Sequence, residues 1–174
     1  MSDTPTKALP KLFIPALGPL YAKLEPLAWP LIRVTAGLML VPHGYQKLFV
    51  GGVGKTAAGF AKMGLEPAYP LALYIALLEF AGGIMLALGL FTRAVATLVI
   101  GFMAVAVVHV HMKNGFLWTA GSYEYPLFWG LVCVAIAIRG GGPLSLDAKN
   151  VMANRALGVF YMASGRAAEA EPHF

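Results

Sequence analysis

The chain has 174 residues, of which 59% are hydrophobic and 12% are charged, and its mean hydropathy is +0.71. A soluble domain has about 25% charged residues, so this composition excludes an ordinary soluble protein. Four apolar stretches reach, or nearly reach, the ~20 residues that a helix needs to cross a bilayer. The sequence therefore predicts a polytopic membrane protein. The formal net charge of +5 then indicates membrane topology and attraction to lipid rather than nucleic-acid binding.

In chain order, residues 1–26 form a leader that mixes aromatic and aliphatic side chains with lysines, as is typical of a segment lying along a membrane surface. The first apolar stretch starts too far into the chain, and is too long, for a cleaved signal peptide. Four spans follow at about residues 27–48, 69–90, 94–112 and 123–138. Only helices satisfy their own backbone within one apolar segment, so all four are predicted to be helical.

The fourth stretch is the shortest, and it can span the membrane only if it includes residues from Ser122 onward or lies where the bilayer is thinner. Residues 141–174 are expected to form an amphipathic C-terminal tail. The predicted fold is therefore all-α: a four-transmembrane-helix bundle over residues 27–140, flanked by an amphipathic segment at each end. Lysine and arginine are more frequent on the side of the termini and Arg93 than on the side of Lys55. By the positive-inside rule both termini are cytoplasmic, and we expect a bacterial inner (cytoplasmic) membrane.

Two ionisable residues lie well inside the predicted spans, Arg33 in the first and Glu79 near the middle of the second. A charge at mid-membrane costs about 2.5–3.5 kcal/mol, so neither side chain should face lipid. One interpretation is that they form an ion pair that fixes how the two helices dock. Another is that Glu79 is a proton-accepting or substrate-binding group, and both can hold at once. Small residues beside them, among them Gly37, Gly44 and Gly83, favour close helix packing.

A second polar layer is predicted near the outer ends of the helices, where His43, Lys47, His109, His111 and Glu124 lie at similar depth. Pro42 is expected to kink the first helix beside this layer. We predict that His43, His109 and Glu124 meet in an outward-facing pocket with Glu79 as its floor and Arg33 below. The alternative is a set of interfacial side chains that are solvated separately, with Lys47 as an anchor whose amine reaches the interface.

Common metal and nucleotide motifs are absent from the sequence, which has no HExxH, no CxxC and no glycine-rich phosphate loop. We therefore predict no metal site of the usual kinds. The single cysteine, Cys133, has no partner for an internal disulfide.

Three segments carry a family resemblance: LIRVTAGLMLVPHGYQKLF, LLEFAGGIMLALGLFTRAVA and GSYEYPLFWGLVCVAIAIRGGGPLSLD. Together they resemble the DoxX family of small four-helix membrane proteins, over about residues 27–149. The matching features are Arg33…His43-Gly44…Lys47, Glu79 followed by Gly82-Gly83, Thr92-Arg93, Glu124-Tyr-Pro126, and Pro143 leading to Ser145-Leu-Asp147. The resemblance implies a four-helix bundle. The family is named for a subunit associated with thiosulfate:quinone oxidoreductase.

The resemblance leaves three functions open. The first is the quinone-linked membrane component of an oxidoreductase, with Arg33, His43, Lys47, Glu79, His109 and Glu124 as its quinone or small-anion pocket. The second is a non-catalytic accessory subunit of a larger respiratory or photosynthetic complex. The third is a haem- or metal-binding or proton-relay protein. In each case we expect the lipid bilayer and other membrane subunits as partners, and whether the chain is itself an enzyme stays open.

Overall fold

The computed structural model describes residues 12–149 together with residues 159 and 165, and these form helices and connecting turns without any strand. The all-α prediction is confirmed. The helices longer than one turn are α1 (Gly18–Tyr45), α2 (Val53–Lys62), α3 (Ala68–Leu77), α4 (Gly83–Leu88), α5 (Thr92–Val105) and α6 (Glu124–Arg139), followed by the single turn α7 (Leu146–Lys149). Three π-helical segments, η2 (Gln46–Val50), η3 (Leu78–Gly82) and η4 (Ala106–His111), continue or join them. Short 3₁₀ turns are η1 (Pro15–Leu17), η5 (Met112–Asn114) and η6 (Trp118–Ala120).

Three continuous helices are long and apolar enough to cross a membrane: Pro15–Val50, Ala68–Leu88 and Thr92–Asn114. They correspond to the first three predicted spans. The first begins earlier than expected, because α1 already starts at Gly18, inside the segment assigned to a surface leader. The fourth predicted span is a helix, α6, but it has only 16 residues. Residues 1–11 of the leader, and the tail beyond Lys149 apart from 159 and 165, lie outside the described residues.

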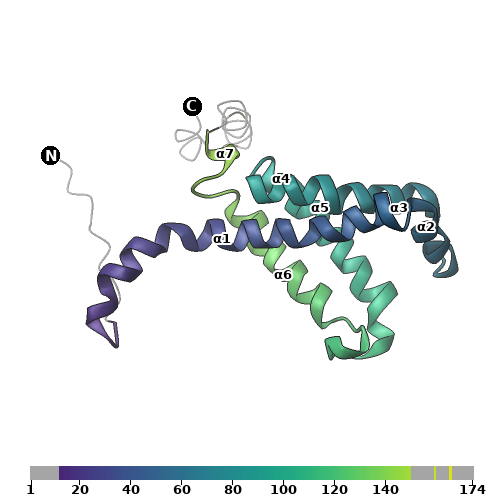
Figure 1. Ribbon diagram of the computed structural model, residues 1–174, viewed down its shortest axis with the longest axis horizontal. Helices are drawn as coiled ribbons and strands as arrows, with labels where there is room; N and C mark the ends of the chain where they lie inside the picture. Colours follow the sequence, from purple (N-terminus) through teal and green to yellow (C-terminus); the bar gives the residue numbers. More distant parts are fainter. Residues whose placement is uncertain (1–11, 150–158, 160–164, 166–174) are drawn as a thin grey trace.

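α2, which fills the connection between the first two spans, was not predicted from the sequence. Its apolar residues Val53, Ala57 and Phe60 follow helical spacing, and Ala57 is buried. α2 packs against α3, so this connection is a folded cover over one end of the bundle rather than an open loop (Figure 1).

α1 packs along η3 and α4, and α5 packs along α6. Glycines allow α1 to approach its neighbour closely: a Cβ on Gly37 would lie 2.5 Å from the Gly83 carbonyl oxygen, and one on Gly44 would lie 2.3 Å from the Phe80 nitrogen. Helices in lipid have no hydrophobic driving force for association, so the van der Waals packing that such close contact allows contributes to their docking. The prediction that small residues dock these two helices is confirmed.

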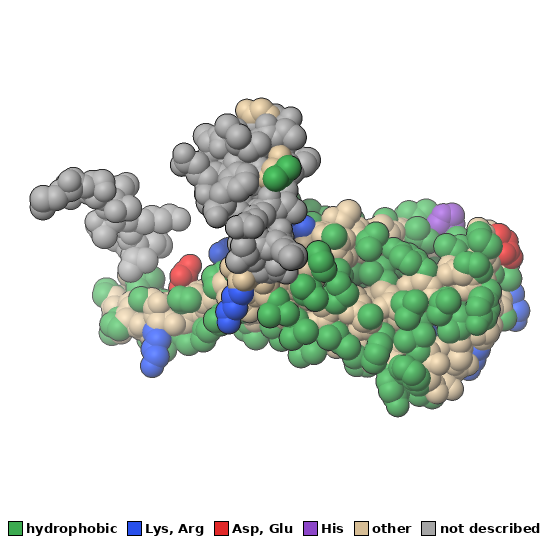
Figure 2. Space-filling view, turned by 90° about the horizontal axis from the view of Figure 1, so that it is seen from above, with side chains coloured by type: hydrophobic (Ala, Val, Ile, Leu, Met, Phe, Trp, Pro, Cys, Tyr) green, Lys and Arg blue, Asp and Glu red, His purple; other side chains and the backbone are tan. Residues whose placement is uncertain are grey.

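The core lies where α4, α5 and α6 meet, and Leu86, Val99, Cys133 and Ile136 are fully buried there. The outer surface is largely apolar. Figure 2 shows hydrophobic side chains over the body of the bundle and charged side chains toward its ends. An apolar surface of this extent is the surface expected against lipid. The fold is thus that of a multi-pass membrane protein.

After α6 the chain turns back and attaches to the middle of α1, to the end of α4 and to the start of α5. The Trp29 indole donates a hydrogen bond to the Gly140 carbonyl (3.0 Å). The Asp147 carboxylate accepts hydrogen bonds from the N–H groups of Phe91 (2.7 Å) and Thr92 (2.8 Å), which begin α5. A carboxylate in this position satisfies free donors and complements the helix dipole. We call residues 140–147 the closing segment.

Candidate functional site

Glu79, on η3, forms an ion pair and hydrogen bond with Lys47, on η2. Their side chains are 5% and 25% exposed, respectively. A buried carboxylate needs a paired charge, and here the ammonium group supplies it. The predicted Arg33–Glu79 pair is therefore wrong. Lys47, for which the sequence also allowed a simple anchoring role at the interface, is the partner of the buried Glu79.

Arg33 has a different role, although it is as deeply buried as expected, at 1% exposure. Its guanidinium donates hydrogen bonds to the carbonyl oxygens of Leu86 (3.1 Å), Ala87 (2.6 Å) and Leu144 (3.2 Å). The first two are at the C-terminus of α4, where free carbonyls and the negative end of the helix dipole favour a cation. Arg33 therefore joins α1, α4 and the closing segment, and it shares no hydrogen bond or ion pair with Glu79.

Each of the three π-helical segments of the described chain supplies a polar side chain to the same region of the bundle. η2 supplies Lys47, η3 supplies Glu79 and η4 supplies His111. A π turn inserts one residue into an α-helix and is often found at functional sites. Each turn changes the direction of the side chains that follow it. The convergence of three such turns from three helices singles out this region of the bundle.

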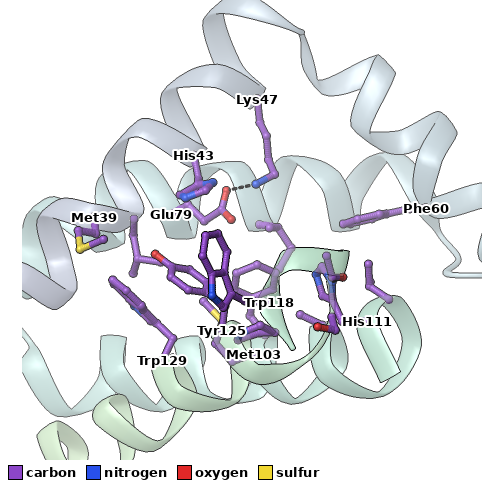
Figure 3. Close-up of a pocket in the computed structure, with 18 residues that line it drawn as sticks. Met39, His43, Lys47, Phe60, Glu79, Met103, His111, Trp118, Tyr125 and Trp129 are labelled. Carbon is purple, nitrogen blue, oxygen red and sulfur yellow. Dashed lines mark hydrogen bonds and ion pairs between the residues drawn. The ribbon is translucent and has the colours of Figure 1, made fainter. Parts of the chain in front are cut away.

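These residues line a cavity of about 550 Å³, which we call the Glu79 cavity. This volume lies within the range of about 300–1,000 Å³ typical of small-molecule sites. Figure 3 shows His43, Glu79 and Lys47 together on one wall, with Trp118, Tyr125 and Trp129 facing them. The lining residues are Met39, Leu40, His43, Lys47, Phe60, Ile75, Glu79, Phe102, Met103, Ala106, Val110, His111, Trp118, Gly121, Ser122, Tyr125, Pro126 and Trp129.

Of the six predicted site residues, His43, Lys47 and Glu79 line this cavity, while Arg33, His109 and Glu124 do not. The histidine that lines the cavity from the second half of the chain is His111. Its Nδ1 donates to the Gly121 carbonyl (2.6 Å), whereas His109 is exposed.

Glu124 does begin α6, as expected. Its carboxylate accepts a hydrogen bond from the Trp118 N–H (2.9 Å), and it lines a neighbouring surface groove instead of the cavity. Its observed interaction orders the turn before α6.

The aromatic wall was not predicted from the sequence. Tyr125 and Trp129 are one helical turn apart on α6, and their rings lie 5.3 Å apart. Their spacing was the available signal, since residues four apart share a helix face. Trp118 and Phe60 come from a turn and from α2, whose positions the sequence pattern does not indicate.

One polar group in this wall has no partner: the indole Nε1 of Trp129 is buried and makes no hydrogen bond with the described residues. Such a group is costly to leave unpaired, so it is suited to a ligand that brings an acceptor oxygen. The cavity thus combines a carboxylate–ammonium pair, an adjacent imidazole and an unpaired donor within mainly apolar walls. Among the described residues, no cluster of three or more His, Cys, Asp or Glu could hold a metal ion.

Fold and site together define a small, multi-pass helical membrane protein with an acid–base pair at one wall of an aromatic cavity. The DoxX family model matches residues 28–112, which include His43, Lys47, Glu79 and His111. The chain belongs to the DoxX family.

Two curated proteins are similar to this chain. A Bacillus subtilis (strain 168) protein named "Putative oxidoreductase CatD" is 32% identical over 117 residues, covering 67% of this chain and 82% of that protein. A Haemophilus influenzae (strain ATCC 51907 / DSM 11121 / KW20 / Rd) protein named "Uncharacterized protein" is 28% identical over 130 residues, covering 73% and 93%. No solved structure matches the chain.

Proposed function

We propose that this protein is the quinone-binding membrane component of an oxidoreductase assembly, and that the Glu79 cavity holds the quinone head group. The observation that carries the proposal is the pairing of Glu79 and Lys47 opposite an aromatic wall with a free donor on Trp129. A quinone head group is planar and apolar, with acceptor oxygens on opposite edges. It fits walls of this kind, since aromatic rings stack on its faces and donors reach its oxygens.

The chain's own residues would supply binding and protons. Lys47 and Trp129 donate hydrogen bonds to acceptor oxygens, while Glu79 and His43 can accept or release a proton beside them. When bound, a quinone supplies two-electron, two-proton redox chemistry. Its electrons would be exchanged with a partner subunit, which the lipid-facing surface leaves room to contact. The oxidoreductase named among the relatives is consistent with this role.

The same proposal includes the topology expected from the sequence. α6 is the fourth span, extended by the residues before Glu124, and both termini lie in the cytoplasm of a bacterium with the chain in the inner membrane. This orientation is supported by the distribution of lysine and arginine. It would open the Glu79 cavity toward the outer half of the bilayer.

The test measures the binding of a tail-less quinone to the protein in lipid nanodiscs. Binding is monitored by the quenching of tryptophan fluorescence. Trp118 and Trp129 line the cavity and act as reporters. Lys47→Met removes a charged donor worth about 1.5–3 kcal/mol, so we expect binding at least about tenfold weaker.

The matched control is Lys55→Met. This exposed lysine on α2 is outside the cavity lining, and its removal should leave binding unchanged. A wild-type protein that binds no quinone would contradict the proposal, and so would equal losses in the two lysine variants. Either result would leave the accessory-subunit function as the better account.

A further inference from the structure

A second hollow lies beside the Glu79 cavity, between α1 and α6, and we call it the α1–α6 groove. It has a volume of about 510 Å³, and its walls are almost wholly apolar. Met39, Tyr125 and Trp129 line both the groove and the cavity. The two spaces therefore adjoin along these three side chains.

The groove faces the side of the bundle that contacts lipid. Leu31 and Phe128 on its rims are 67% and 62% exposed, and Ala36 at its floor is 3% exposed. The small side chain of Ala36 leaves a trough between larger neighbours on both helices. A trough of this kind accepts an extended hydrocarbon chain.

We infer that the α1–α6 groove holds the hydrocarbon tail of the molecule whose head group occupies the Glu79 cavity. The ligand is then a tailed amphiphile that enters sideways from the bilayer, not a water-soluble substrate. This inference rests on the proposed function and adds the chemical class and route of its ligand. Another groove, lined by Trp118 and Leu131, also adjoins the cavity, but Glu124 is among its lining residues. A carboxylate makes that route less suited to a hydrocarbon chain.

The groove contributes little binding energy of its own, and its role is to provide the volume that the tail needs. A tail that moves from lipid into the groove exchanges one apolar environment for another, so there is little hydrophobic gain. A head group that carries a tail can nevertheless occupy the cavity only if the tail can extend from the cavity through the groove into the lipid. Filling the groove should therefore exclude the tailed ligand and leave the tail-less one able to bind.

Thr35 offers a suitable position for this change. It lines the groove from α1, and its side chain is exposed, so Thr35→Phe adds bulk to the groove without overpacking the core. Leu38→Phe is the matched control. Leu38 lies on the same helix, is 54% exposed and does not line the groove.

The experiment compares two quinones with the same head group, one tail-less and one with a long alkyl tail, by tryptophan quenching in nanodiscs. For each ligand the affinity of the variant is divided by that of the wild type, which cancels partitioning into lipid. For Thr35→Phe we expect about a tenfold loss with the tailed quinone and little change with the tail-less one. Leu38→Phe should change neither.

The outcomes separate the two ideas. If Thr35→Phe leaves tailed binding intact, or weakens both ligands equally, the tail route is wrong while the quinone site stands. If the wild type binds neither quinone, the proposed function fails and the tail route fails with it.

Discussion

The ion pair between Lys47 and Glu79 makes a quantitative prediction about stability. Lys47→Met leaves the Glu79 carboxylate, 5% exposed, without a counter-charge. Breaking a buried pair in this way costs about 3–5 kcal/mol, and we expect the lower value because the pair is only partly buried. Glu79→Gln should cost about 1 kcal/mol. The reason is that Lys47 is 25% exposed, and its long side chain can bring the ammonium group to water.

The double variant removes both charges, so its loss should be smaller than the sum of the single losses. We expect a coupling free energy of about 1–3 kcal/mol, as found for residues in direct contact. The free energy of unfolding would be measured in mixed micelles by SDS titration with circular dichroism. A parallel cycle with Arg33→Met and Glu79→Gln should be additive within about 0.5 kcal/mol, since these residues have separate partners. Additive losses for Lys47 and Glu79, or strong coupling for Arg33 and Glu79, would refute the arrangement described here.

Two further predictions concern helix packing and capping. Gly44→Ala would place a Cβ 2.3 Å from the Phe80 nitrogen, so it should lower the free energy of unfolding by about 1–3 kcal/mol. Gly101→Ala, with nothing within 4 Å, should be neutral or stabilising in the same titration, and equal losses would contradict the close contact. Asp147→Ala removes the acceptor at the start of α5 and should cost about 0.5–2 kcal/mol, whereas Asp147→Asn should retain part of that stability. No difference between wild type and Asp147→Ala in thermal unfolding would show that the cap is dispensable.

Much of the fold could be predicted because the bilayer imposes it. A span must satisfy its backbone within the segment, so apolar length alone located three of the long helices. The cost of a charge in lipid likewise predicted that Arg33 and Glu79 are buried, which they are. The glycines indicated close helix contact because helices in lipid associate through close packing, which small residues allow. Each of these inferences needs only the local sequence and the nature of the solvent.

The partner of Glu79 could not be predicted in this way, because it depends on where the helices end and how they are rotated. Arg33 donates hydrogen bonds to the carbonyl oxygens at the C-terminus of α4. The helix ends there because Gly89 adopts a left-handed conformation (φ 70°). The histidine that enters the cavity depends on the π turn over Ala106–His111. An inserted residue changes the face that each side chain presents, and a regular helical period does not reveal it. The prediction of His109 over His111 failed for this reason.

The closing segment has a mechanical consequence. Residues 18–88 and 92–139 form two arms, and at one end the closing segment ties them through Trp29, Arg33 and Asp147. Around the Glu79 cavity, at the opposite end, the hydrogen bonds found among the described residues stay within one arm or the other, such as Lys47–Glu79 and His111–Gly121. The side chains that line the cavity from the two arms form no hydrogen bond with one another among the described residues. The polar contacts between the two arms are thus concentrated at the closing segment. A separation of the arms at the cavity would break apolar packing but none of the hydrogen bonds found among the described residues.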